Sequence, residues 1–180
     1  MALTPTQRGV IRGMAIAATL TFGAIIGAAA WHPDVLLPGD DTVARLTYAL
    51  KWNLLPAACL LVAVLRLARH RFFTPEDIDG GGLSPGTQRA HVLQSILQNT
   101  LEQTVLAALA YSIWVVVMPH GWLTSIPAAA LLFVFGRILF SRGYERGAHA
   151  RAAGFGLTFY PSVLMLAIAA VYLTQHMVFG

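Results

Sequence analysis

The sequence predicts an all-α integral membrane protein, a bundle of five transmembrane helices. Of its 180 residues, 57% are hydrophobic and only 11% are charged, and the mean hydropathy is +0.65. Five apolar runs reach the roughly 20 residues needed to cross the hydrocarbon core of a bilayer. Strand-like alternation of apolar and polar residues is absent. We therefore expect no separate soluble domain.

The five runs cover residues 10–31, 48–67, 91–118, 122–140 and 152–176. The first contains only Arg12, near its start. The second has Lys51 at one end and Pro56 inside, which predicts a kink. The third carries one carboxylate, Glu102, and the fourth meets Arg137 as it leaves the membrane. The fifth has no charged residue.

The first run has two interpretations. Arg8 and Arg12 precede its apolar core, and Ala28-Ala29-Ala30 offers a cleavage site of the kind that follows a signal sequence. Its apolar core is long for a signal sequence, which favours a retained helix. Either outcome leaves the other four helices oriented in the same way.

The basic residues predict the orientation. Ten of the twelve arginines and lysines lie at the amino terminus, in the loop 68–90 with its flanks, or in the loop 141–151 with its flanks. By the positive-inside rule these three regions face the cytoplasm. We expect a multi-pass protein of a bacterial inner membrane with a cytoplasmic amino terminus. We interpret the pI near 9.7 as a signal of orientation and anion binding and expect no nucleic-acid partner.

Several functional classes lack their sequence patterns. Cys59 is the only cysteine, so an intrachain disulfide is impossible, and no metal-binding pattern is present. The linker 74–86 contains three consecutive glycines, but no Lys-Ser or Lys-Thr pair follows them as in a phosphate-binding loop. It is predicted to be a flexible connector.

The third run carries a polar stripe. Gln94, Ser95, Gln98, Asn99 and Glu102 recur at steps of three and four residues, so they share one helix face. An ionisable group in a membrane segment is costly unless it is paired or faces water. The stripe therefore predicts either hydrogen-bonded contacts between helices or subunits, or contacts to a ligand.

An arginine-rich turn joins the last two runs. Arg137, Arg142, Arg146 and Arg151 concentrate positive charge where two apolar helices meet the membrane surface. This arrangement suits a ligand with an anionic head and an apolar tail. The alternative is that the arginines only set the topology.

Two motifs resemble the family of membrane-associated proteins in eicosanoid and glutathione metabolism, MAPEG, which includes microsomal glutathione transferases and leukotriene C4 synthase. The first is GRILFSRGYERGAHAR, from Gly136 to Arg151, and the second is Asn99-Thr100-Leu101-Glu102. The resemblance covers roughly residues 46–178. It implies a MAPEG-like four-helix domain over residues 46–180, preceded by an extra transmembrane helix and a non-cytoplasmic loop within residues 1–45.

The resemblance also implies a homotrimer in the lipid bilayer, with glutathione as co-substrate between subunits and a lipophilic small molecule as the second substrate. Arg151 would be the catalytic residue, because it matches the arginine that stabilises the glutathione thiolate. The implied contacts to the rest of glutathione are Arg69, Arg71, Gln98, Asn99, Glu102, Arg137 and Tyr144. The expected function is a membrane-bound glutathione transferase or peroxidase that attacks lipophilic electrophiles or peroxides.

Two departures favour an alternative. Catalytic relatives have an arginine where this chain has Ser95, and some have a tyrosine where it has Phe140. A shifted register that uses Arg89 restores the arginine but loses the asparagine and the glutamate. The alternative function is a non-catalytic MAPEG-type lipid-binding or scaffold protein, and a transporter is a third option.

Overall fold

The computed structural model describes residues 2–31 and 33–179. Its five long helices are α1 Pro5–Trp31, α2 Thr42–Phe73, α3 Gln88–Val117, α4 Ser125–Gly143 and α5 Ala148–Phe179. Short 3₁₀ turns connect them at η1 Asp34–Leu36, η2 Pro75–Asp77, η3 His120–Thr124 and η4 Tyr144–Arg146. Within the described residues there is no strand, so the expected all-α class is confirmed. All five helices are long and apolar enough to cross a membrane.

The ends of the helices follow local rules. The side chain of Asp41 accepts a hydrogen bond from the amide of Ala44 (3.0 Å) and caps the start of α2. Thr87 caps α3 in the same way, through the amide of Ala90 (3.2 Å). Gly147 separates η4 from α5 with φ of 99°, a conformation that costs glycine little.

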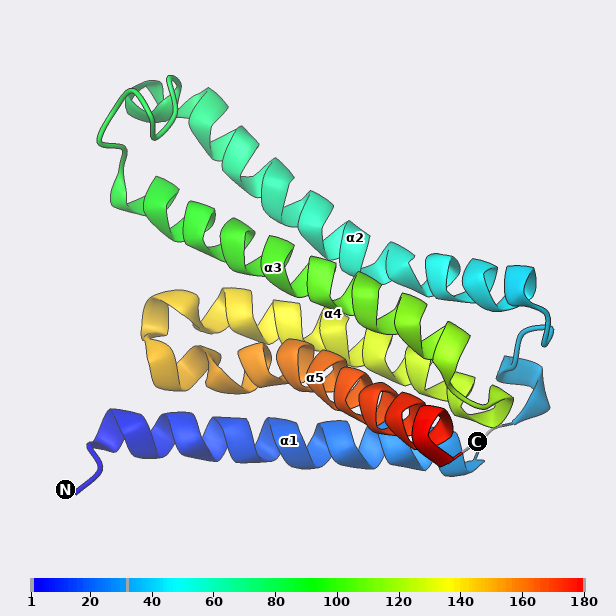
Figure 1. Cartoon of the computed structure of the whole chain (residues 1–180). Helices are drawn as coiled ribbons and strands as arrows, with labels where there is room; N and C mark the ends of the chain where they lie inside the picture. The colour runs from blue at the N-terminus through cyan, green and yellow to red at the C-terminus, as the bar shows by residue number, and fades with distance from the viewer. Residues whose placement is uncertain (1, 32, 180) are drawn as a thin grey trace.

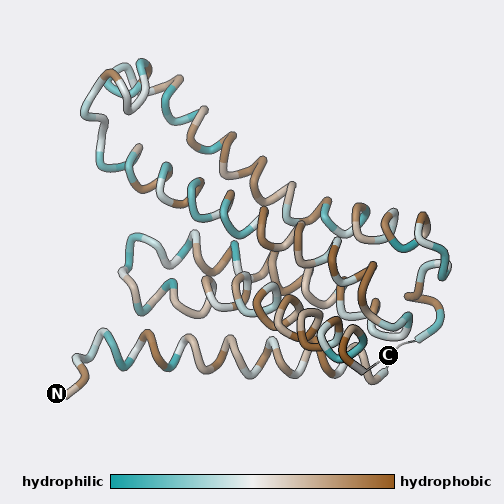
Figure 2. The backbone as a smooth tube through the Cα atoms, in the orientation of Figure 1, coloured by the Kyte–Doolittle hydropathy of each residue, from teal (hydrophilic) through white to brown (hydrophobic). Residues whose placement is uncertain are grey.

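The helices are not stacked in chain order (Figure 1). α2 packs along α3, α4 packs along α5, and α1 packs against α5 and α4. α1 and α2 therefore lie on opposite sides of the bundle although a short linker joins them. α2 changes direction along its length, and Pro56 lies inside it. Figure 2 shows hydrophobic residues through the middle of the helices and hydrophilic residues gathered towards their ends.

The large side chains of the core lie towards η3, at the end away from the arginine-rich turn. Tyr111, Trp114 and Leu123 are almost fully buried there. Two hydroxyl groups fasten α1 to this end, because Thr124 Oγ1 donates to the carbonyl of Ala28 (2.7 Å) and Ser125 Oγ to that of Ile25 (3.0 Å). α1 is thus held to the start of α4 by hydrogen bonds as well as by apolar contacts.

Glycines let α4 and α5 approach closely at the opposite end. A Cβ atom on Gly143 would overlap the backbone of Ala150, and one on Gly154 would overlap the backbone of Phe140. Small residues allow this approach between membrane helices, where packing supplies much of the association energy. The approach places the end of α4 directly against the start of α5.

The linker between α2 and α3 differs from the flexible connector predicted from its sequence. Asp77 is 1% exposed and accepts hydrogen bonds from the amide of Thr87 (2.7 Å), the hydroxyl of Thr87 (2.6 Å) and Nε2 of His70 (2.8 Å). A buried carboxylate is stable only with such partners, and here they join the end of α2 to the start of α3. Three consecutive glycines predict flexibility, so the sequence alone did not indicate these hydrogen bonds.

Acid should open this clamp. The hydrogen bonds from Thr87, its hydroxyl first, hold the pKa of Asp77 below its ordinary value of 3.8, with a further contribution from His70. A lowered pKa means that ionised Asp77 stabilises the clamp above pH 3.8, and that this stabilisation is lost as the pH falls through the lower, folded value. The protection of the amides in residues 74–87, measured relative to their intrinsic exchange rate at each pH, should therefore fall as the pH drops below 3.8.

The matched variants are Asp77→Asn and Asp79→Asn. Asp77→Asn should accelerate exchange in the linker at neutral pH, because one amide cannot accept all three hydrogen bonds as well as a carboxylate. Asp79 is exposed, so Asp79→Asn should leave the exchange rate unchanged. Equal exchange in both variants would contradict the clamp.

Candidate functional site

A cavity of about 320 Å³ lies at the end of the bundle where the arginine-rich turn joins α4 to α5. We call it the Arg151 cavity. Its lining comes from α1, α3, α4, η4 and α5: Val10, Met14, Ser95, Asn99, Phe140, Tyr144, Ala148, Arg151, Ala152 and Phe155. None of these lining residues is acidic. The cavity is at the small end of the volume range of ligand pockets.

Arg151 lies in the first turn of α5. Its guanidinium carbon is 4.2 Å from the centre of the Tyr144 ring, which is a cation–π contact, and the ring of Tyr144 packs edge-on against Phe140. The amino-terminal end of a helix carries a partial positive charge, and α5 begins at Ala148 beside the cavity. The guanidinium and the helix end therefore both favour an anion in this cavity.

Arg137 lies behind the cavity and is 4% exposed. Its Nη1 donates to Oδ1 of Asn99 (2.9 Å), its Nη2 donates to Oγ1 of Thr158 (2.7 Å), and its guanidinium carbon is 4.4 Å from the centre of the Phe140 ring. No carboxylate lies within ion-pair distance of Arg137 in the described part of the chain. The structure thus buries a guanidinium on neutral partners, a costly arrangement that is typical of functional positions in membrane proteins.

Asn99 lies between Arg137 and the Arg151 cavity. It lines the Arg151 cavity and accepts the hydrogen bond from Arg137. The amide group of Asn99 is therefore oriented by Arg137, and the charge of Arg137 acts on the cavity from one residue away. Of the residues predicted from the sequence, the structure brings together Asn99, Tyr144 and Arg151 in one cavity and places Arg137 directly behind them.

The other four predicted residues lie elsewhere. Gln98 donates to Glu102 (3.0 Å), and both side chains are exposed on α3. Arg71 donates to Gln94 (3.2 Å), and Arg69 lines a different cavity of about 370 Å³ at the end of α2. A single chain therefore provides only part of the glutathione contacts that the resemblance implies.

Thr158 and α1 contribute to the site although neither belongs to the two motifs found in the sequence. Thr158 is 1% exposed on α5 and holds the buried guanidinium. Gly154 and Gly156, which precede it, are a sequence signal of close helix approach at this position. Val10 and Met14 carry no such signal, because any apolar residue of a membrane helix can face lipid or protein.

The family model described as the MAPEG family matches residues 45–171 of the chain. The chain belongs to the MAPEG family. The matched region covers α2, α3, α4 and most of α5 and leaves α1 outside. Neither the curated proteins nor the solved structures include a match to this chain.

Membership of the MAPEG family, together with five membrane-crossing helices, confirms that this is an integral membrane protein. It supports a function in glutathione or eicosanoid metabolism at a membrane. Among residues 2–31 and 33–179, no group of three histidine, cysteine, aspartate or glutamate side chains lies close enough to hold a metal ion. The polar groups that line the Arg151 cavity are the guanidinium of Arg151, the amide of Asn99 and the hydroxyls of Ser95 and Tyr144.

Proposed function

We propose that this MAPEG protein is a membrane-bound glutathione transferase or peroxidase that activates the thiol of glutathione for attack on a lipophilic electrophile or peroxide. The observation that carries the proposal is Arg151, which faces a cavity without acidic lining from the first turn of α5. Positive charge next to a helix start is the environment that lowers the pKa of a thiol. The family assignment supports glutathione as the source of the thiol.

The reaction needs no nucleophile from the protein. A free thiol has a pKa near 8.5, and lowering it by about two units requires about 2.7 kcal/mol of preferential stabilisation of the thiolate. Arg151 and the end of α5 supply this stabilisation, and the thiol proton passes to water. The sulfur then forms a bond to the electrophilic carbon of the second substrate, whose leaving group departs with the bonding electron pair. Asn99 and Tyr144 position the peptide.

The proposal is tested on the thiol itself. Wild-type protein with saturating glutathione at pH 7 should show ultraviolet thiolate absorbance above that of free glutathione, and it should conjugate a generic aryl halide. Glutathione binding with neither a thiolate signal nor turnover would reject the enzyme. That result would favour the non-catalytic lipid-binding or scaffold protein, which the absence of an arginine at Ser95 supports.

Assembly as a homotrimer is part of the proposal. Gln98 and Glu102 are exposed, and Arg69 and Arg71 lie away from the Arg151 cavity. A neighbouring subunit would complete the contacts that these residues leave open. Glutathione has two carboxylates, and arginine binds such groups best through charge-assisted pairs. Native mass spectrometry should report three chains, and a single-chain mass would contradict this part of the proposal.

The proposed orientation places the amino terminus in the cytoplasm. It rests on the ten basic residues that flank one side of the predicted membrane segments. In a Cys59→Ser background, Ser84→Cys should react with a membrane-impermeant thiol reagent only from the cytoplasmic side, and Asp40→Cys only from the opposite side. The reverse labelling pattern would invert the topology.

A further inference from the structure

A second cavity, of about 460 Å³, lies on the other side of Arg137, between α2, α3 and α4. We call it the α2–α4 groove. Its walls are mostly apolar, and its lining residues are Leu55, Ala58, Cys59, Val62, Ala63, Arg66, Ile96, Thr100, Val134, Arg137, Ile138, Ser141 and Arg142. No acidic residue is among them. The groove is distinct from the Arg151 cavity, since the two share no lining residue.

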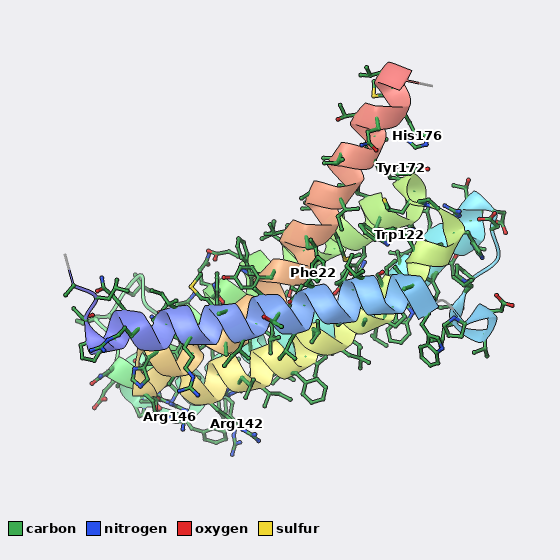
Figure 3. The ribbon with its side chains drawn as sticks, turned by 90° about the horizontal axis from the view of Figure 1, so that it is seen from below. Phe22, Trp122, Arg142, Arg146, Tyr172 and His176 are labelled. Carbon is green, nitrogen blue, oxygen red and sulfur yellow. The ribbon has the colours of Figure 1, made fainter. Side chains whose placement is uncertain are left out.

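The charges of the groove are concentrated in three arginines. Arg66 near the end of α2 and Arg142 near the end of α4 are exposed, and neither has an ion pair or a side-chain hydrogen bond within the part of the chain that the structure describes. Arg142 lies at the end of the bundle where α1 begins, well away from Trp122 and Tyr172 (Figure 3). The third is Arg137, whose buried Nε has no hydrogen-bond partner. Cationic groups thus lie at one end of the apolar α2–α4 groove.

We propose that the α2–α4 groove binds one anionic phospholipid of the surrounding bilayer. Its phosphate would lie between Arg66 and Arg142, and one acyl chain would lie along Leu55, Ala58 and Val62. Basic pockets between membrane helices, at the level of the headgroups, recognise anionic lipids in this way. The apolar walls lie on membrane-spanning segments of α2, α3 and α4, so a ligand that fills the groove needs an acyl chain as well as a phosphate.

Lipid binding in the α2–α4 groove does not depend on the proposed thiol chemistry. The groove is nevertheless adjacent to the Arg151 cavity. Arg137 lines the groove and also orients Asn99 of the Arg151 cavity. A lipid in the groove would therefore seal the outer side of the buried guanidinium from water. This position gives the lipid a route to influence glutathione binding without touching glutathione.

The test is lipid retention by the full-length protein in native mass spectrometry. After exchange into detergent with equal phosphatidylglycerol and phosphatidylcholine, each wild-type chain should retain one phosphatidylglycerol in preference to phosphatidylcholine. Arg66→Gln with Arg142→Gln should lower that preference by about thirtyfold, since each basic residue near the headgroups contributes about 1 kcal/mol. The control pair Arg8→Gln with Arg12→Gln removes the same charge from exposed positions of α1 and should retain the lipid.

A second pair of variants tests whether the acyl chain lies in the α2–α4 groove. Ala58 and Ala57 are both exposed and adjacent on α2, but only Ala58 lines the groove. Ala58→Trp should reduce retention of phosphatidylglycerol, whereas Ala57→Trp should not. Alkylation of Cys59, which lines the groove, by N-ethylmaleimide should slow when phosphatidylglycerol is present.

Three outcomes would overturn the proposal. Equal retention of both lipids would show that the arginines do not select an anionic headgroup. Displacement of the bound lipid by inorganic phosphate would show a simple anion site. Protection of Cys59 without any bound lipid, and only in the oligomer, would show that a second copy of the chain covers the groove. Loss of glutathione turnover alone would leave the lipid site standing, because retention is measured without glutathione.

Discussion

Replacement of Arg151 by alanine should abolish the thiolate absorbance of bound glutathione and remove most conjugating activity. Without the guanidinium, the thiol pKa returns towards 8.5, and only a few per cent of the thiol is ionised at pH 7. The kcat/KM for conjugation should fall by about a hundredfold, the size of effect seen when one group that stabilises developing charge is lost. Stopped-flow absorbance and steady-state kinetics measure the two effects.

The matched control is Arg146→Ala. Arg146 is exposed on η4 in the same turn but does not line the Arg151 cavity, so its loss should leave both signals intact. Arg151 is half-buried at the start of α5, outside the apolar core, and Arg151→Ala should therefore fold and assemble normally. A full thiolate signal in Arg151→Ala would mean that Arg151 does not stabilise the thiolate. Arg137 or the arginines at the end of α2 would then be the next candidates.

Arg137→Met should leave the protein as stable as the wild type, or more stable, while lowering glutathione affinity. The buried guanidinium has no carboxylate partner among the described residues, so its desolvation is offset only by neutral hydrogen bonds and aromatic contacts. Exchange of a buried ion pair for apolar residues of similar volume is often neutral or stabilising by about 1–4 kcal/mol, and we expect the same direction for a guanidinium that is held only by neutral partners. Thermal unfolding in detergent and glutathione titration test the two effects.

Thr158→Val provides the contrasting variant. It removes one partner of the guanidinium and leaves the buried charge in place, so it should destabilise the protein by about 1–3 kcal/mol. The structure thus predicts that loss of the charge is tolerated and that loss of its partner is not. A large fall in unfolding temperature for Arg137→Met, with none for Thr158→Val, would mean that the arginine serves stability and not the site.

Some features of the site were accessible from the sequence because they depend on residue type and local order. Asn99, Tyr144 and Arg151 were identified through two motifs, and they share one cavity. Gln98 and Glu102 satisfied the same helical spacing, yet they bond to each other on an exposed face. Helical spacing places residues on a common face within about one turn, but it does not say which side of that face meets a neighbouring helix.

The amino-acid sequence by itself determined the membrane class and the five helices, because a bilayer demands about 20 apolar residues per crossing and satisfies no unpaired backbone groups. Only the tertiary structure decided that α1 packs on α5 and brings Met14 to the Arg151 cavity. It also decided that Arg137 is held by Thr158, 21 residues away in the chain. Apolar helices offer similar faces to lipid and to protein, so the choice of neighbours rests on close packing at glycines and on a few hydrogen bonds between distant segments.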